Sequence, residues 1–188
     1  MKVINLNLVM KDLNSTQIEK QIPAVEEAIN IVDTLAMKAV EGLQNSSNRF
    51  LVAERLNCFG SIIVPHLEKL LQESNNSEVK ILASLVLLQL NSKIGVPFLL
   101  VAIKEDDEYA ILAAQHLAKA GIKHAIEPIY TRLTSSKLEE IDLIVSLLDS
   151  LNKLNGKLPQ DLLQRFTSEN IPWQIKTKLE EQLFSVKF

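Results

Sequence analysis

The stretch Ala118–Tyr130 (AKAGIKHAIEPIY) ends one helical pattern at Gly121 and begins another in which Pro128 lies in the first turn. Glycine adopts, at little cost, the left-handed backbone conformation that ends many helices. A proline in the first turn loses little hydrogen bonding, because the first N–H groups of a helix have no partner within that helix. The stretch therefore predicts the elbow between two helices of a helical hairpin.

The same punctuation recurs at nearly constant intervals beyond residue 46. Four prolines, spaced 32, 31 and 31 residues apart, are Pro65, Pro97, Pro128 and Pro159. A small residue in mid-helix recurs every 30 residues, and a predicted N-cap precedes it by six residues. These pairs are Ser47 with Ala53, Ser77 with Ala83, and Asp107 with Ala113. Two independent markers that keep one period indicate a repeated helical hairpin.

Apolar residues at three- and four-residue steps predict two helices in each unit. The predicted first helices cover 48–59, 78–90, 107–120 and 137–154, and the second helices cover 62–73, 94–104, 123–134 and 159–168. A last helix, opened by Asn170 and Pro172, closes the chain. We therefore expect a single all-α domain over 1–188, an α-α superhelix. Its parts are an N-terminal arm and capping helix (1–46), about four hairpins (47–168) and a C-terminal capping helix (169–188).

The N-terminal segment carries a longer apolar stripe, which predicts an amphipathic helix within a helical cap over 15–45. Pro23 fits the first turn of this helix, and residues 16–19 have the spacing of a capping box. Residues 3–9 alternate apolar and polar side chains, which leaves three alternatives: an extended arm, a turn of helix, or an edge offered to another subunit. The stripe starts at Val25 and continues through Ala28, Ile29, Val32, Leu35, Ala36, Ala39, Val40 and Leu43.

One unit carries a family resemblance. The segment 107–114 (DEYAILAA), followed by Leu117, Gly121, Ala125 and Pro128, resembles a HEAT repeat. A unit length of about thirty residues is similar to the short HEAT-like repeats of bilin (phycobilin) lyases and related bacterial proteins. The resemblance extends over the four hairpins and implies a right-handed, armadillo-like α-solenoid of HEAT-like hairpins. In such folds the second helices line a concave surface, where partners commonly bind.

Composition and charge restrict the kind of partner. The net charge is −3, and the four arginines (Arg49, Arg55, Arg132 and Arg165) form no basic stripe that would suit a nucleic-acid backbone. The longest nearly uncharged apolar runs are too short to cross a bilayer, and the N-terminus lacks the order of a secretory signal. We therefore expect a cytoplasmic protein that binds neither nucleic acid nor membrane. The single cysteine, Cys58, is expected to be a buried structural thiol.

Residue types that often act in catalysis or metal binding have simpler structural explanations in this sequence. The histidines (His66, His116 and His124) lack the i, i+4 spacing of a helical zinc motif and are expected at the surface or at elbows. The acidic run 105–108 is expected to stabilise a helix start rather than bind a cation. No phosphate loop or nucleophile elbow occurs in the sequence, so we expect no enzyme activity, no cofactor and no metal. Trp173 is expected to seal the last hairpin.

A candidate binding site follows from aligning the second helices on their prolines. Three and four residues after the proline, the middle helix has Leu100 and Val101, where its neighbours have polar residues. Together with Phe98, these side chains would form an apolar patch at the centre of the concave surface. A second interpretation stays open, in which the N-terminal helix or neighbouring helices bury this patch. The polar rim would consist of Glu68, Lys69, Thr131 and Arg132.

These expectations describe a non-catalytic protein–protein interaction module, or small scaffold, that binds another protein on its concave surface. The alternative, implied by the resemblance alone, is a bilin lyase-like protein or chromophore-handling chaperone subunit. Cys58 and the histidines would then be the candidate reactive residues. Self-association through the N-terminal arm is a further interaction that the pattern of residues 3–9 allows.

Overall fold

The computed structural model describes residues 5–166 and 171–184. Within these ranges the chain forms helices and no β-strand, which confirms the all-α prediction. The N-terminal pair is α1 (Leu6–Leu13) and α2 (Ile18–Asn45). The following helices are α3 (Arg49–Leu56), η1 (Asn57–Ile63), α4 (Val64–Glu73), α5 (Ser77–Gln89), α6 (Val96–Glu105), α7 (Ala110–Lys119), η2 (Lys123–Ala125), α8 (Ile126–Ser135), α9 (Ile141–Lys153), α10 (Gln160–Arg165) and α11 (Trp173–Phe184).

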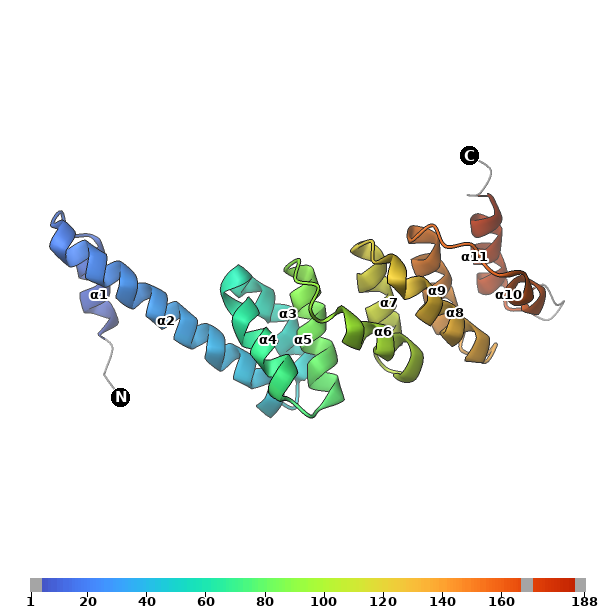
Figure 1. The fold of residues 1–188 in the computed structure, drawn as a ribbon, viewed down its shortest axis with the longest axis horizontal. Helices are drawn as coiled ribbons and strands as arrows, with labels where there is room; N and C mark the ends of the chain where they lie inside the picture. The colour runs from blue at the N-terminus through green and yellow to red at the C-terminus, as the bar shows by residue number, and fades with distance from the viewer. Residues whose placement is uncertain (1–4, 167–170, 185–188) are drawn as a thin grey trace.

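The helices follow one another along a single long axis, with α1 and α2 at one end and α10 and α11 at the other (Figure 1). The first helices of successive hairpins pack in series: α3 contacts α5, α5 contacts α7, α7 contacts α9, and α9 contacts α11. Three second helices pack on the first helix that follows them: α4 on α5, α6 on α7 and α8 on α9. Every layer therefore buries its apolar side chains against its neighbours.

The central helix α5 shows this most clearly. Its residues 81–88 are all buried, including Ser84, whose hydroxyl donates to the backbone oxygen of Lys80 at 2.7 Å. A helix that is buried on all sides must be surrounded by other elements, and α5 contacts α2, α3, α4, α6 and α7. The mid-helix alanines predicted from the period are buried as well. They are Ala53, Ala83 and Ala113.

The elbows of the hairpins use a left-handed residue, as the opening stretch predicts. Gly121 has φ +67°, and the N–H of Ile122 donates to the oxygen of Leu117 at 2.9 Å, which satisfies a free carbonyl at the end of α7. Asn91 and Asn155 do the same after α5 and α9, with φ +65° and +57°. Asparagine tolerates this conformation better than other non-glycine residues. A left-handed residue, glycine or asparagine, therefore marks these three elbows, and a search for glycine alone misses two of them.

The repeated prolines lie at the starts of second helices. Pro65 and Pro97 occupy the second positions of α4 and α6, Pro128 occupies the third position of α8, and Pro159 immediately precedes α10. At these positions a proline removes few backbone hydrogen bonds and opposes continuation of the preceding helix. The four prolines thus occupy corresponding positions in successive hairpins, with an offset of one or two residues.

The predicted N-caps are wrong by one residue. Asn76, not Ser77, caps α5 by accepting from the N–H of Val79 at 3.1 Å. Asp106, not Asp107, accepts from the N–H groups of residues 108 and 109 ahead of α7. Ser47 does not cap α3 either: the N-cap is Asn48, whose N–H donates to the hydroxyl of Ser46 at 2.9 Å. Adjacent Ser, Asn and Asp residues are all good caps, so propensity cannot choose between them.

The N-terminal region differs most from prediction. Residues 6–13 form a helix, the second of the three alternatives for residues 3–9; residues 1–4 lie outside the described residues. Helix α2 begins at Ile18, so Pro23 lies inside it rather than in its first turn. Pro23 is exposed, so water can solvate the carbonyl that its missing N–H leaves free. The N-terminal half of α2, with α1 packed on it, projects away from the stacked layers (Figure 1).

Predictions for the last hairpin and the cysteine are corrected too. Trp173 is 73% exposed and does not seal the hairpin; Ile175 and Leu179 of α11 are buried instead. Cys58, in the 3-10 turn η1, is exposed rather than buried. Asn170, the predicted start of the last helix, lies outside the described residues.

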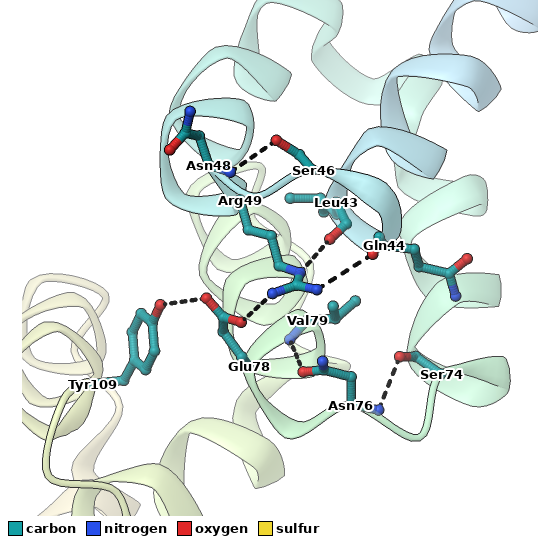
Figure 2. A network of polar contacts seen from close by, with 10 residues as sticks. All are labelled: Leu43, Gln44, Ser46, Asn48, Arg49, Ser74, Asn76, Glu78, Val79 and Tyr109. Atoms are coloured by element: carbon teal, nitrogen blue, oxygen red, sulfur yellow. Dashed lines mark hydrogen bonds and ion pairs between the residues drawn. The ribbon is translucent and has the colours of Figure 1, made fainter.

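A polar network links α2 and three consecutive first helices (Figure 2). The guanidinium of Arg49 on α3 donates to the backbone oxygens of Leu43 and Gln44 at the end of α2, at 3.0 and 3.4 Å. It also pairs with Glu78 on α5 at 2.7 Å. The second carboxylate oxygen of Glu78 accepts from the hydroxyl of Tyr109, next to α7, at 3.0 Å. One carboxylate therefore ties three layers together.

The raised pKa of Tyr109 makes the free energy of unfolding depend on pH in the alkaline range. Burial, followed by the hydrogen bond to Glu78, raises its pKa from 10.0 to about 12. A group whose pKa is higher in the folded state contributes stability that is lost as the pH rises between the two values. We expect the free energy of unfolding to fall from pH 10 to 12, and to fall less steeply in Tyr109→Phe. Urea unfolding across that window measures this; equal slopes would refute it.

Candidate functional site

The apolar patch predicted on the second helices is only partly accessible. Val101 on α6 is 48% exposed, so α2 does not cover it. Leu100 and Phe98 are half-buried and pack against the core, and the ammonium of Lys80 lies 5.4 Å from the centroid of the Phe98 ring. Between them, Leu99 is fully buried. The accessible apolar surface here is therefore essentially one side chain with the edges of two others.

The predicted polar rim is already engaged in contacts within the chain. Glu68 accepts from the hydroxyl of Ser92 at 3.2 Å. The hydroxyl of Thr131 donates to a backbone oxygen of its own helix at 3.0 Å. Lys69 lies 3.8 Å from Glu73 and is exposed. Lys69 also lines a groove of about 330 Å³ between α2 and α4, beside Val40 and His66.

Arg132 is held by contacts with α6 and the turn that follows it. Its side chain is only 11% exposed, pairs with Asp107, and donates to the backbone oxygen of Lys104 at the end of α6 at 3.3 Å. Arg165 on α10 donates in the same way to Thr134 at the end of α8, at 2.9 Å. Arg49 does so at the end of α2. Cations suit these positions, because the last carbonyls of a helix lack partners and carry partial negative charge. Most of the few arginines thus clamp helix ends.

The histidines do not form a common site. His66 lies 2.8 Å from Asp33, which joins α4 to α2, and His124 is exposed at the elbow after α7. Burial, with a smaller contribution from the charge of Lys119, lowers the pKa of His116 below 6.5. Over residues 5–166 and 171–184, no three His, Cys, Asp or Glu side chains gather in a way that could hold a metal ion.

Most of the exposed large apolar side chains of the described residues lie on α1 and α2. Fifteen large apolar side chains are exposed in the described part of the chain, and ten of them belong to these two helices. Five form a stripe along α2, between 42% and 64% exposed, which we call the α2 stripe. Its members are Ile18, Ile22, Val25, Ile29 and Val32.

The α2 stripe has the spacing of a coiled-coil seam. Its members are separated by 4, 3, 4 and 3 residues, which is the heptad alternation that keeps one face of a helix toward a partner helix. All five are β-branched. The same alternation continues through Ala36, Ala39 and Leu43, which pack into the body of the protein. A single seam is thus buried at its C-terminal end and exposed at its N-terminal end.

Helix α1 covers one flank of the stripe and leaves the stripe itself open. The α2 residues buried or half-buried under α1 lie roughly a third of a turn away from the stripe. Helix α1 adds the exposed Leu6 and Met10 on the side that an antiparallel hairpin turns toward the stripe. The buried or half-buried α2 residues on this flank include Gln21, Ala24, Ala28 and Ile31.

The sequence contained a signal for this surface that the prediction did not use. The predicted amphipathic stripe starts only at Val25, after Pro23. The heptad spacing begins at Ile18, before the proline, and continues to Leu43, over 26 residues. The first hairpin can cover only the part of such a helix that it reaches. When an apolar seam is longer than the helices that pack against it, the remaining part of the seam is left unpaired.

The fold and this surface define an all-helical protein whose helices pack in series along one axis, with one projecting arm whose coiled-coil-like face is unpaired among the described residues. Comparisons of the chain with protein-family models, with curated proteins and with solved structures found no match. Of the helices that the structure describes, none combines the length and the apolar character needed to cross a membrane.

Proposed function

We propose that the protein is a non-catalytic protein-interaction module, or small scaffold, and that the α2 stripe is its main docking surface. The observation that supports this is the concentration of exposed large apolar side chains on the arm. Contiguous apolar surface that borders polar residues is typical of protein-binding sites, whereas single exposed apolar residues are ordinary. The β-branched residues of the stripe are stiff, so they lose little side-chain freedom when a partner binds.

The stacked layers act as a rigid support in this proposal. The period of about 31 residues and the series of packed first helices support a HEAT-like solenoid. The arm is anchored in this support by the buried residues Ala36, Val40 and Leu43. The proposal also includes a second, smaller docking site on the second helices around Val101. It further includes a cytoplasmic location.

Affinity capture from the source cells tests the proposal, with Ile22→Gln/Ile29→Gln as the stripe variant. Glutamine is a good helix former, and both isoleucines are more than half exposed, so we expect an unchanged free energy of unfolding. We expect at least a tenfold loss of the proteins captured by the native chain. Quantitative mass spectrometry of the captured proteins is the measurement.

The matched control is Leu51→Gln/Ile94→Gln, which removes two apolar side chains of similar exposure from outside the arm. It should capture the same proteins as the native chain. If the control loses them equally, or the stripe variant keeps them, the arm is not the main docking surface. Val101→Gln, run in parallel, measures the share of the smaller site.

A further inference from the structure

The geometry points to a single amphipathic helix of another protein as the occupant of the α2 stripe. This helix docks its apolar face on the stripe and presents lysine or arginine along the edge that meets Glu19, Glu26 and Asp33. The inference rests on the proposed function and specifies the chemistry of the partner at that surface.

The shape of the stripe fits a helix. Residues 18–32 span about 21 Å, which is close to four helical turns and two heptads. β-Branched side chains at alternating three- and four-residue steps form the holes into which the side chains of a facing helix insert. An extended strand or an irregular loop has no matching periodicity. The occupant is therefore a helix with apolar residues at the same spacing.

Charge determines which helix fits. Glu19, Glu26 and Asp33 follow one another at intervals of seven residues, so they form one edge beside the stripe. All three are exposed, and Glu19 and Glu26 form no ion pair with any described residue. No basic residue of α2 lies on this edge, because Lys20 is turned about 100° around the helix from Glu19 and Lys38 about 140° from Asp33. The opposite edge of the stripe is covered by α1. The open edge therefore has two acidic side chains without an ion pair, Glu19 and Glu26, and ends at Asp33, which is in contact with His66 of α4.

A second copy of the chain fits this edge poorly. In an antiparallel pair of α2 helices, Glu26 would face its own counterpart and Glu19 would face Asp33 of the other copy. In a parallel pair, the acidic edge would face the flank containing Gln21 and Ala28, which offers no positive charge. Like charges across a coiled-coil edge select against pairing. The same edge would repel an anionic lipid surface. A basic partner helix is the occupant that satisfies both the seam and its edge.

Two synthetic helical peptides test this inference. Each has about three heptads with Leu and Ile at the seam positions; one carries Lys at both edges and the other carries Glu. Fluorescence anisotropy with the full chain measures both affinities at low and high salt. We expect the Lys peptide to bind at least tenfold more tightly at low salt, and the difference to shrink as salt increases.

Charge reversal in the protein provides the decisive comparison. Glu19→Lys/Glu26→Lys should reverse the order of the two peptides, whereas Glu139→Lys/Glu180→Lys, with the same change in net charge far from the arm, should keep it. Equal binding of the two peptides, a preference for the Glu peptide, or an unchanged order in Glu19→Lys/Glu26→Lys would overturn the inference.

The outcomes separate the inference from the proposed function. If both peptides bind equally and Ile22→Gln/Ile29→Gln loses both, the docking surface stands and the basic occupant is wrong. If sedimentation shows a dimer of the native chain that Ile22→Gln/Ile29→Gln dissociates, the occupant is a second copy and the inference is overturned. If neither peptide binds and the native chain is monomeric, the inference fails; capture experiments alone then decide the proposed function.

Discussion

Replacing Gly95 by valine is expected to destabilise the protein by about 3 kcal/mol or more, which is the upper range for overpacking a well-packed interior. Gly95 precedes α6 and lies against α5. A Cβ atom at Gly95 would lie 2.6 Å from Cβ and 2.7 Å from Cα of Ser84. Backbone atoms of α5 cannot move aside as a flexible side chain can, so α5 and α6 would have to separate.

Gly121→Ala is the control, because glycine at position 121 is favoured by its backbone conformation and not by close packing. Gly121 has φ +67° and nothing within 4 Å of an added Cβ, so only backbone strain of about 1–2 kcal/mol is expected. Urea unfolding followed by circular dichroism measures both variants. A second test combines Gly95→Ala with Ser84→Gly: rescue should be partial, since the Cα atom of residue 84 stays close. If Gly95→Val were no worse than Gly121→Ala, close helix approach would not be the reason for glycine at position 95.

Leu117→Ala is expected to lower the free energy of unfolding by about 2–5 kcal/mol, because it leaves a cavity where the layers meet. Leu117 on α7 is fully buried, and α7 contacts α5, α6 and α9. For a chain of this size a loss of about 3 kcal/mol lowers the Tm by roughly 6–12 °C. Thermal and urea unfolding of the variant are the measurements.

The same substitution on the arm supplies the control. Leu35 on α2 is 56% exposed, so Leu35→Ala should change the free energy of unfolding by less than about 0.5 kcal/mol. A similar loss at both positions would mean that another copy of the chain covers the arm in solution. Leu117→Ala therefore tests the core of the layers, and Leu35→Ala tests whether the arm is free.

Local patterns predicted most helix boundaries, because the interactions that end these helices are local. Gly121 with Pro128 located an elbow correctly, and the predicted helix 62–73 matches Val64–Glu73 within two residues. Left-handed residues, helix-start prolines and capping side chains act within a few residues of the chain. The caps were misplaced by one residue for the same reason. Neighbouring polar residues such as Asn76 and Ser77 compete on equal terms until the turn takes its shape.

The candidate site could be predicted less well. Val101 is exposed as expected, but Arg132 is held by Asp107 and by the end of α6, contacts that span 25 and 28 residues of chain. Whether a polar side chain faces solvent or clamps a neighbouring helix depends on which helix lies beside it. Trp173 and Cys58 were misassigned for the same reason: residue type gives a tendency toward burial, and the packing partner decides it.

The amino-acid sequence by itself determined that this chain is helical, where its hairpins turn, and that α2 carries one continuous apolar seam, because these properties follow from backbone preference and residue spacing. Only the tertiary structure decided that this seam is divided. Ala36, Val40 and Leu43 are buried because the first hairpin reaches them, whereas Ile18, Ile22 and Val25 lie beyond that hairpin and stay exposed. Burial requires a neighbour in space, and no pattern along one helix specifies how far that neighbour extends.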